Sequence, residues 1–346
     1  MRTGIILLSC LCVTAAAGAQ RLSGPTNPKA QKTFAGAQDW AKAEDYAQAL
    51  DAYRKADKQD GGHCSLCEAK VVEMGIEGGD FKSADAAAHV LIAEATTPPM
   101  VAYAHMELGF VDYHQALTEK KTGLLAEADR EFQASMAAYL IDPEVHFYDG
   151  LALARMHQDT AAKVQFEAYL KTAPAADVDR TRAQRFIQQP DLARARMAPA
   201  FSMTTLDGRH VSLDGLAGKV VLIDFWATWC VPCINALPQI RELAHQFAGQ
   251  PLVLISISID KDRDDAKWKQ FVAKNHMTWL QVRDGSGDIA KLFGVTAIPH
   301  TFTIDANGVL ADQEVGDSEL GHTIKKLCAR AEQMQESPQG ANKAAE

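Results

Sequence analysis

The sequence predicts two domains, an all-α domain built of helical repeats followed by an α/β domain. A chain of 346 residues is longer than one typical domain. Residues from about Phe34 to Pro174 are rich in Ala, Glu, Lys, Gln and Leu and carry few β-branched runs, which is typical of helices. From Ala200 onward, continuous apolar runs alternate with amphipathic segments, which is typical of a sheet covered by helices.

A degenerate internal repeat runs through the helical region. "EDYAQALDAYRKA" aligns with "GDFKSADAAAHVL", and "AEADREFQAS" aligns with "TAAKVQFEAYLKTAP". A small residue opens each second helix, with spacings of 35, 44 and 34, at Ala49, Ala84, Ala128 and Ala162. Such a residue lets two antiparallel helices approach closely, and an aromatic ring one turn later fills the groove between them. Tyr53, Phe132 and Phe166 hold that place, and Ala88 interrupts the series.

This repeat pattern resembles the tetratricopeptide repeat, loosely, over roughly 140 residues. The resemblance implies a solenoid whose concave surface binds a partner protein or peptide. An irregular helical bundle is the other interpretation of the same pattern. We place the TPR-like helical repeat domain at 30–175, followed by a capping helix and a proline-containing linker at 176–198.

The N-terminal stretch, "MRTGIILLSCLCVTAAAGAQ", combines a basic residue, an apolar run and small residues that end at Ala19. It predicts a signal peptide at 1–19, and therefore an exported protein of the periplasm or cell envelope of a bacterium. An uncleaved anchor and a lipoprotein site at Cys10 are alternatives that would tether the chain to a membrane by its N-terminus. The net charge of −9 excludes nucleic acid as an expected partner, because that partner needs a basic surface.

The elements of the α/β domain, at 199–335, follow one another in a regular order. "FSMTTLDGRHVSL" predicts a hairpin, "KVVLIDFWA" a buried central strand, "CINALPQIRELAHQFA" an amphipathic helix and "PLVLISISID" a second buried strand. "RDDAKWKQFVAKNH" predicts a helix, "TWLQVRD" a short edge strand and "GDIAKLFGV" a short helix. "HTFTIDANGVLADQEV" predicts a hairpin around Asn307-Gly308, and "SELGHTIKKLCARAEQM" a closing helix. We expect a mixed sheet with helices on both faces, and a disordered tail at 336–346.

The stretch "FWATWCVPC" places Cys230 just past the C-terminal end of the first central strand, where open α/β sheets hold their sites. Two intervening residues bring Cys230 and Cys233 within bonding reach. The free N–H groups of the following helix stabilise a thiolate on Cys230, which improves it as a leaving group and sets its redox poise. The pattern predicts a redox-active dithiol. A zinc site is disfavoured, because it needs four ligands and these flanks offer two.

Asp224 and Pro299 add to this interpretation. Asp224 lies six residues before Cys230 in an otherwise apolar strand, and a buried carboxylate has a raised pKa and can take the proton of Cys233. A solvated aspartate at a strand end is the alternative. Pro299 begins a strand in "TAIPHTF", and a cis bond there would present the backbone of Ile298 to an extended substrate. An ordinary trans proline at a sheet edge is the alternative.

Taken together, "FWATWCVPC", Asp224, Pro238, "AIP" and the leading "APAFSMTTLDG" resemble the thioredoxin fold, and most closely the TlpA/ResA-like thiol–disulfide oxidoreductases of the redoxin group. The resemblance covers about Pro199 to Met334. It implies exchange of disulfides with protein substrates outside the cytoplasm, and hence a part in cell redox homeostasis. It also implies an external thiol as electron donor and no cofactor or resident metal.

The resemblance assigns roles to residues that match the family's motifs. It implies that Cys230 is the nucleophile, that Cys233 resolves the mixed disulfide, and that Asp224 is the buried proton acceptor. Trp229 flanks the site, and Pro299 is the cis-proline that faces the substrate. His300 stands where the family often has Thr, and either favours the thiolate and senses pH or is a residue of the rim.

Two other departures bear on the activity. Members that serve cytochrome c maturation carry a Glu three residues after the second cysteine, where this chain has Ala236, which weakens that specific role. Related peroxiredoxins place their reactive cysteine in a Pro-x-x-x-Thr-x-x-Cys setting, which "DFWATWC" lacks. A thiol peroxidase is therefore the less favoured activity, but it stays an alternative. A repeat-based binding adaptor whose thiols are incidental is another.

A second pair, Cys64 and Cys67 in "GGHCSLCEAK", begins a predicted helix without a preceding central strand. Three interpretations stay open for it: a structural disulfide, an electron relay to Cys230, or a metal site that includes His63. Haem attachment is excluded, because Glu68 stands where that motif needs a histidine.

Overall fold

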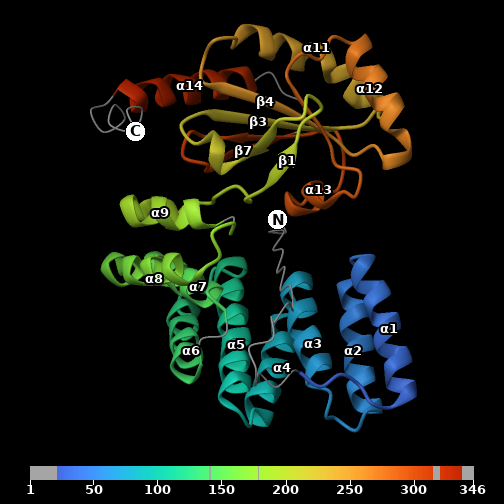
Figure 1. Cartoon of the computed structure of the whole chain (residues 1–346), viewed down its shortest axis with the longest axis vertical. Helices are drawn as coiled ribbons and strands as arrows, with labels where there is room; N and C mark the ends of the chain where they lie inside the picture. The colour runs from blue at the N-terminus through green and yellow to red at the C-terminus, as the bar shows by residue number, and fades with distance from the viewer. Residues whose placement is uncertain (1–21, 140–141, 178, 315–319, 337–346) are drawn as a thin grey trace. The chain divides into compact units, whose positions relative to one another are not determined.

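The computed structural model describes residues 22–139, 142–177, 179–314 and 320–336. The chain divides between Arg194 and Ala195 into a helical unit and a unit built on a mixed sheet (Figure 1). An all-α region followed by an α/β domain is the predicted fold class, which is thus confirmed. The predicted signal peptide at 1–19 and tail residues 337–346 lie outside the described residues. In the ranges that are described, no helix has both the length and the apolar character needed to cross a membrane.

The helical unit is a succession of helix pairs joined by short loops, in which each helix packs on the next along the chain (Figure 1). The pairs are α1 (Pro28–Lys42) with α2 (Tyr46–Gln59), α3 (Ser65–Gly78) with α4 (Phe81–Glu94), α5 (Pro98–Thr118) with α6 (Leu124–Ala138), and α7 (Glu144–Arg155) with α8 (Asp159–Thr172). The short helices α9 (Arg180–Gln188) and α10 (Pro190–Arg194) end the unit.

Close packing within each pair depends on small residues at the helix crossings. The four alanines that open the second helices are buried: Ala49, Ala84, Ala128 and Ala162. A Cβ at Gly109 of α5 would stand 2.6 Å from the ring of Phe132 in α6, and one at Gly150 of α7 would stand 2.7 Å from the ring of Phe166 in α8. These glycines let the aromatic rings reach the partner backbone. In the α5/α6 and α7/α8 pairs, the ring therefore packs against a position where a side chain would collide with it.

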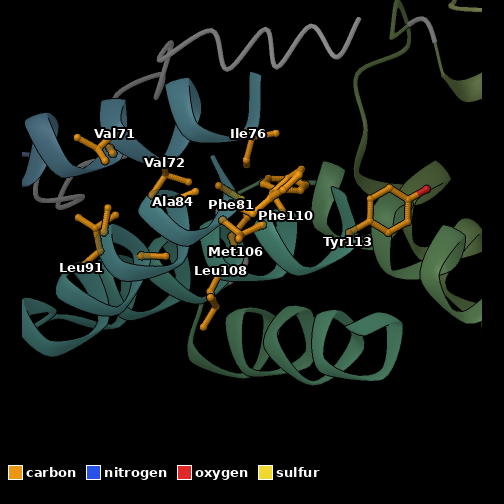
Figure 2. Packing of buried hydrophobic residues seen from close by; sticks show 14 of the residues in the cluster. Val71, Val72, Ile76, Phe81, Ala84, Leu91, Met106, Leu108, Phe110 and Tyr113 are labelled. Carbon is orange, nitrogen blue, oxygen red and sulfur yellow. The ribbon is translucent and has the colours of Figure 1, made fainter. Parts of the chain in front are cut away.

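The core of this unit continues from one helix pair to the next. Figure 2 shows where α3, α4 and α5 meet. Valine and isoleucine side chains from α3, phenylalanine and leucine from α4 and longer apolar chains from α5 fill the space, among them Val71, Val72, Ile76, Phe81, Leu91, Met106, Leu108 and Phe110. The helices are apolar on more than one face because each packs against two neighbours.

The second unit is a five-stranded sheet in the order β5-β4-β3-β6-β7. β3, β4 and β5 are parallel, whereas β6 and β7 run antiparallel to their neighbours, so the sheet is mixed as predicted. The strands are β3 (Val220–Trp226), β4 (Leu252–Ser258), β5 (Leu280–Arg283), β6 (His300–Ile304) and β7 (Leu310–Glu314). A separate hairpin, β1 (Ser202–Thr204) and β2 (His210–Ser212), precedes them.

Alternation along β3 assigns its side chains to the two faces of the sheet. Val220 and Leu222 pack with α11 (Val231–Gln246) and α14 (Leu320–Glu336), whereas Ile223 lies in the core of the other face. The remaining helices are α12 (Asp265–Lys274) and α13 (Asp288–Leu292). Cys328 of α14 is a buried free thiol in the first of these cores, and burial raises its pKa to about 11. By the same alternation, Asp224 lies on the face covered by α11.

Candidate active site

The junction of β3 and α11 holds the first cysteine pair. β3 ends at Trp226, a short turn follows, and Cys230 is the N-cap of α11. Pro232 lies in the first turn of the helix, where its missing N–H is not needed. Cys230 and Cys233 form a disulfide with an S–S distance of 2.03 Å, and the Cys233 N–H donates to the Cys230 sulfur over 3.2 Å. The structure thus joins the two predicted catalytic thiols at a helix N-terminus.

Both sulfur-bearing residues of this disulfide are almost fully buried. Cys230 is 4% exposed and Cys233 is 6% exposed. The reason is the apolar cluster around them, in which Trp226 and Leu237 pack with the two cysteines. Their neighbour Trp229, in contrast, is 58% exposed and projects at the surface. Only a small part of the disulfide is therefore exposed to solvent, and the exposed indole of Trp229 lies next to it in the chain.

Asp224 is buried in β3 beneath the helix that carries the cysteines. Burial raises its pKa to about 6, although the Ser256 hydroxyl opposes the rise by donating to Oδ2 over 3.0 Å. Trp279 Nε1 in turn donates to Ser256 Oγ over 2.8 Å. The carboxyl group is thus oriented by a two-step chain of donors, and it holds or releases a proton close to neutral pH.

Ser256 and Trp279 are absent from the sequence prediction. The available signal was the alternation of serine with apolar residues in "LISIS", which is unusual for a buried strand. Its meaning depends on register, because β3 and β4 pair with Asp224 opposite Ser256. Strand register cannot be read from either strand alone.

A second buried carboxylate, Asp260, fastens the turn that precedes Cys230. It is fully buried and accepts from the backbone N–H of Thr228 over 2.8 Å and from the Thr228 hydroxyl over 2.7 Å. The Ser258 hydroxyl donates to it as well, over 2.6 Å. These bonds tie the cysteine-bearing turn to the end of β4. The amino-acid sequence gives no local sign of this anchor, because its partners are 32 residues apart.

The loop before β6 brings Ile298 against the cysteine cluster. The Ile298–Pro299 peptide bond is cis. His300 begins β6 opposite Phe225, and its ring stacks on Phe302 with 4.6 Å between ring centroids. Burial lowers the pKa of His300, so its imidazole is neutral over a wider pH range than a free histidine. A lowered pKa makes the ring less available as a positive charge beside a thiolate.

The second cysteine pair lies in the helical unit. Cys64 is the N-cap of α3 and forms a disulfide with Cys67 at an S–S distance of 2.02 Å. Both are buried against Ala56 and Leu66. Across the described ranges, no group of three or more His, Cys, Asp or Glu side chains is arranged to hold a metal ion.

Comparisons with known proteins concern the α/β unit. The Redoxin family matches residues 193–328. The thiol-disulfide oxidoreductase ResA of Bacillus thuringiensis subsp. konkukian is 30% identical over 145 residues, which is 41% of this chain and 83% of the relative. The thiol:disulfide interchange protein DsbE of Pseudomonas fluorescens biotype C is 33% identical over 120 residues, which is 34% of this chain and 64% of the relative.

Among solved structures, the thioredoxin domain of a thiol-disulfide oxidoreductase from Bacteroides vulgatus is 26% identical, with a TM-score of 0.36, and the match covers 39% of this chain and 96% of that one. The helical unit before residue 193 lies outside the Redoxin match. A disulfide at the N-terminus of α11, a buried carboxylate beneath it and the ResA match agree with one another. The chain therefore belongs to the ResA-like thiol–disulfide oxidoreductases of the Redoxin family.

Proposed function

We propose that this oxidoreductase exchanges or reduces disulfides of protein substrates through Cys230 and Cys233, outside the cytoplasm, with an external thiol as electron donor. The observation that carries the proposal is the Cys230–Cys233 disulfide at the N-terminus of α11, above the buried Asp224. The signal-peptide pattern at 1–19 supports export. The helical unit is proposed to bind the partner protein or peptide, as its paired helices suggest.

The reaction begins with the reduced dithiol. The Cys230 thiolate, stabilised by the Cys233 N–H, attacks a substrate disulfide, and a mixed disulfide forms while the first substrate thiol leaves. Cys233 then gives its proton to Asp224 and attacks the sulfur of Cys230, which releases the second substrate thiol. Asp224 suits this transfer because its pKa of about 6 lies near the working pH.

The surface around the disulfide provides the substrate contact. Trp229 offers an exposed aromatic face beside Cys230, and Ile298 packs against the cysteine cluster from the segment that leads into β6. We propose that an extended substrate segment binds along Trp229 and the Ile298–Pro299–His300 segment. These contacts position a substrate cystine at the sulfur of Cys230.

Insulin reduction by the full-length protein tests the enzyme. We expect Cys230→Ser to abolish turnover and Cys233→Ser to accumulate a mixed disulfide, because the resolving thiol is missing. Cys328→Ala is the matched control, since this thiol is buried in α14 in a different core cluster from the disulfide. Turnover of Cys230→Ser equal to that of the unaltered protein would instead support the adaptor with incidental thiols. Consumption of hydrogen peroxide faster than of insulin would support the peroxidase.

Export is tested by itself. Expression with a C-terminal tag, cell fractionation and N-terminal sequencing should recover a protein that begins close to Gln20 in the periplasmic fraction. Recovery of a chain that still carries Met1 in the cytoplasmic fraction would contradict export. Recovery from the membrane fraction would indicate one of the two tethered forms.

A further inference from the structure

The second cysteine pair repeats the local geometry of the active-site pair. Cys64 is the N-cap of α3, as Cys230 is the N-cap of α11. In both pairs the backbone N–H of the second cysteine donates to the sulfur of the first, over 3.1 Å from Cys67 and 3.2 Å from Cys233. Both pairs are closed as disulfides and are almost fully buried. The helix N-terminus therefore stabilises negative charge on Cys64 as it does on Cys230.

The span of the Cys64–Cys67 bond argues against a purely structural role. A disulfide stabilises a fold mainly by restricting the unfolded chain, and the effect grows with the length of the loop that it closes. This bond joins residues only three apart, so it restricts the unfolded chain very little. Asp57 holds the same loop independently, because its carboxylate accepts from the Cys64 N–H over 3.1 Å. The loop thus keeps an anchor that persists when the S–S bond opens.

Two carboxyl groups beside the disulfide, those of Asp57 and Glu68, can supply the proton that thiol exchange requires. Glu68 follows Cys67 in the chain and is hydrogen-bonded to Asp57. Burial and the negative charges of Asp57 and Glu94 raise the pKa of Glu68 to about 7, although Arg54 opposes the rise. At neutral pH the pair therefore carries a proton for part of the time. Such a group can protonate a thiolate that leaves a broken disulfide.

We propose that Cys64–Cys67 is a second redox-active disulfide, which accepts two electrons from a protein dithiol of the CxxC class. The source of the electrons rests on the proposed function, because the reduced Cys230–Cys233 pair is such a donor. A donor thiolate attacks the Cys64 sulfur, the Cys64–Cys67 bond breaks, and Cys67 leaves as a thiolate and takes a proton. The second donor thiolate then attacks the donor sulfur of the mixed disulfide and releases Cys64. The donor ends as a disulfide, and two electrons and two protons have reached the pair.

The segment 22–27 is hydrogen-bonded to the residues around Cys64. The Ser23 hydroxyl donates to the His63 carbonyl over 3.1 Å, and the Ser23 N–H donates to Ser65 Oγ over 2.8 Å. Both acceptors are the immediate neighbours of Cys64. The Leu66 N–H also donates to the Ser23 carbonyl, over 3.0 Å. These bonds hold the segment against the residues on both sides of Cys64. We therefore expect the opening of this segment to affect the rate at which a donor thiolate reaches Cys64, and not the equilibrium constant of the reduction.

A redox titration of the full-length protein tests the proposal. The oxidised chain is equilibrated with graded ratios of reduced to oxidised dithiothreitol, quenched with acid and alkylated, and mass spectrometry quantifies the peptides of each pair. We expect the equilibrium constants of the two pairs to agree within about 100-fold, with the helical circular dichroism unchanged. A Cys64–Cys67 bond that is more than about 100-fold harder to reduce, or that opens only when the helices unfold, overturns the proposal.

Two variants separate the parts of the proposal. In Cys230→Ser/Cys233→Ser, insulin reduction is lost and the titration of Cys64–Cys67 is expected not to change, so failure of the proposed function and failure of this inference are distinguishable. Ser23→Ala should speed the reduction of Cys64–Cys67 several-fold, as expected for loss of a hydrogen bond. The matched control is Thr172→Ala, at the exposed end of α8. Equal rates in the two variants would overturn the role of Ser23.

Discussion

Replacing Asp224 by Asn is expected to stabilise the α/β unit at neutral pH, because it removes a buried carboxylate. Burial raises the pKa of Asp224 from 3.8 to about 6. In the folded state the Asp224 carboxyl group therefore stays protonated up to about pH 6, whereas in the unfolded chain it loses its proton near pH 3.8. A difference of about 2 pKa units at 1.36 kcal/mol each amounts to about 3 kcal/mol. In the unaltered protein this contribution of about 3 kcal/mol to the free energy of unfolding is present below about pH 4 and is lost as the pH rises through about 6.

Urea unfolding of the full-length oxidised proteins measures the effect, with tryptophan fluorescence as the signal. Four of the five tryptophans lie in the α/β unit, at positions 226, 229, 268 and 279, so the signal reports mainly on that unit. We expect the two proteins to have nearly equal free energies of unfolding at about pH 4 and Asp224→Asn to be about 3 kcal/mol more stable at about pH 7. Comparison at each pH cancels the titration of all other groups.

The matched control is Asp288→Asn, which changes an exposed aspartate in the first turn of α13. Its free energy of unfolding should stay within about 0.5 kcal/mol of the unaltered protein. A difference between Asp224→Asn and the unaltered protein that does not depend on pH would refute the reasoning, because it would mean that the carboxyl group does not titrate in this range. A variant that is less stable at about pH 7 would refute it as well.

Three further predictions follow from the packing and hydrogen bonds. Ser256→Ala removes the donor to Asp224 and should move the pH midpoint of mixed-disulfide release up by about one unit, measured by rapid quench; an unmoved midpoint would contradict the orienting role of this serine. Gly150→Ala should destabilise the helical unit by about 1–3 kcal/mol in thermal circular dichroism, because a Cβ there stands 2.7 Å from an aromatic ring, whereas Gly36→Ala, with open space around it in α1, should stabilise the unit by about 1 kcal/mol. Equal effects of the two alanines would show that the crossing of α7 and α8 is looser than described. Thr228→Val leaves a buried carboxylate without one donor and should cost about 1–3 kcal/mol in urea unfolding together with a fall in insulin turnover; full activity would mean that the turn before Cys230 needs no anchor.

Local sequence patterns were sufficient to predict the helices and strands and to pair Cys230 with Cys233. Apolar runs marked β3 and β4 because strands buried on both faces need no alternation, and Asn307-Gly308 marked the hairpin of β6 and β7 because its turn demands positive φ. Spacing alone joined Cys230 to Cys233, since two residues in a helical turn leave the sulfurs in reach. The repeat of small and aromatic residues likewise predicted the helix pairs. The glycines that face the aromatic rings were not predicted, because their role depends on where the two helices cross.

What the sequence by itself determined is therefore local: which segments are strands and helices, and that Cys230 and Cys233 form a pair at the start of a helix. The tertiary structure decided what surrounds them. Only the register of β3 and β4 places Ser256 beside Asp224, and only the return of the chain after β4 brings Asp260 to Thr228. Both depend on residues far apart in the chain, whose proximity follows from the packing of the whole sheet. The pKa of the buried carboxyl group follows from that packing too, because burial costs a charge its solvation and only the fold determines how deep the group lies.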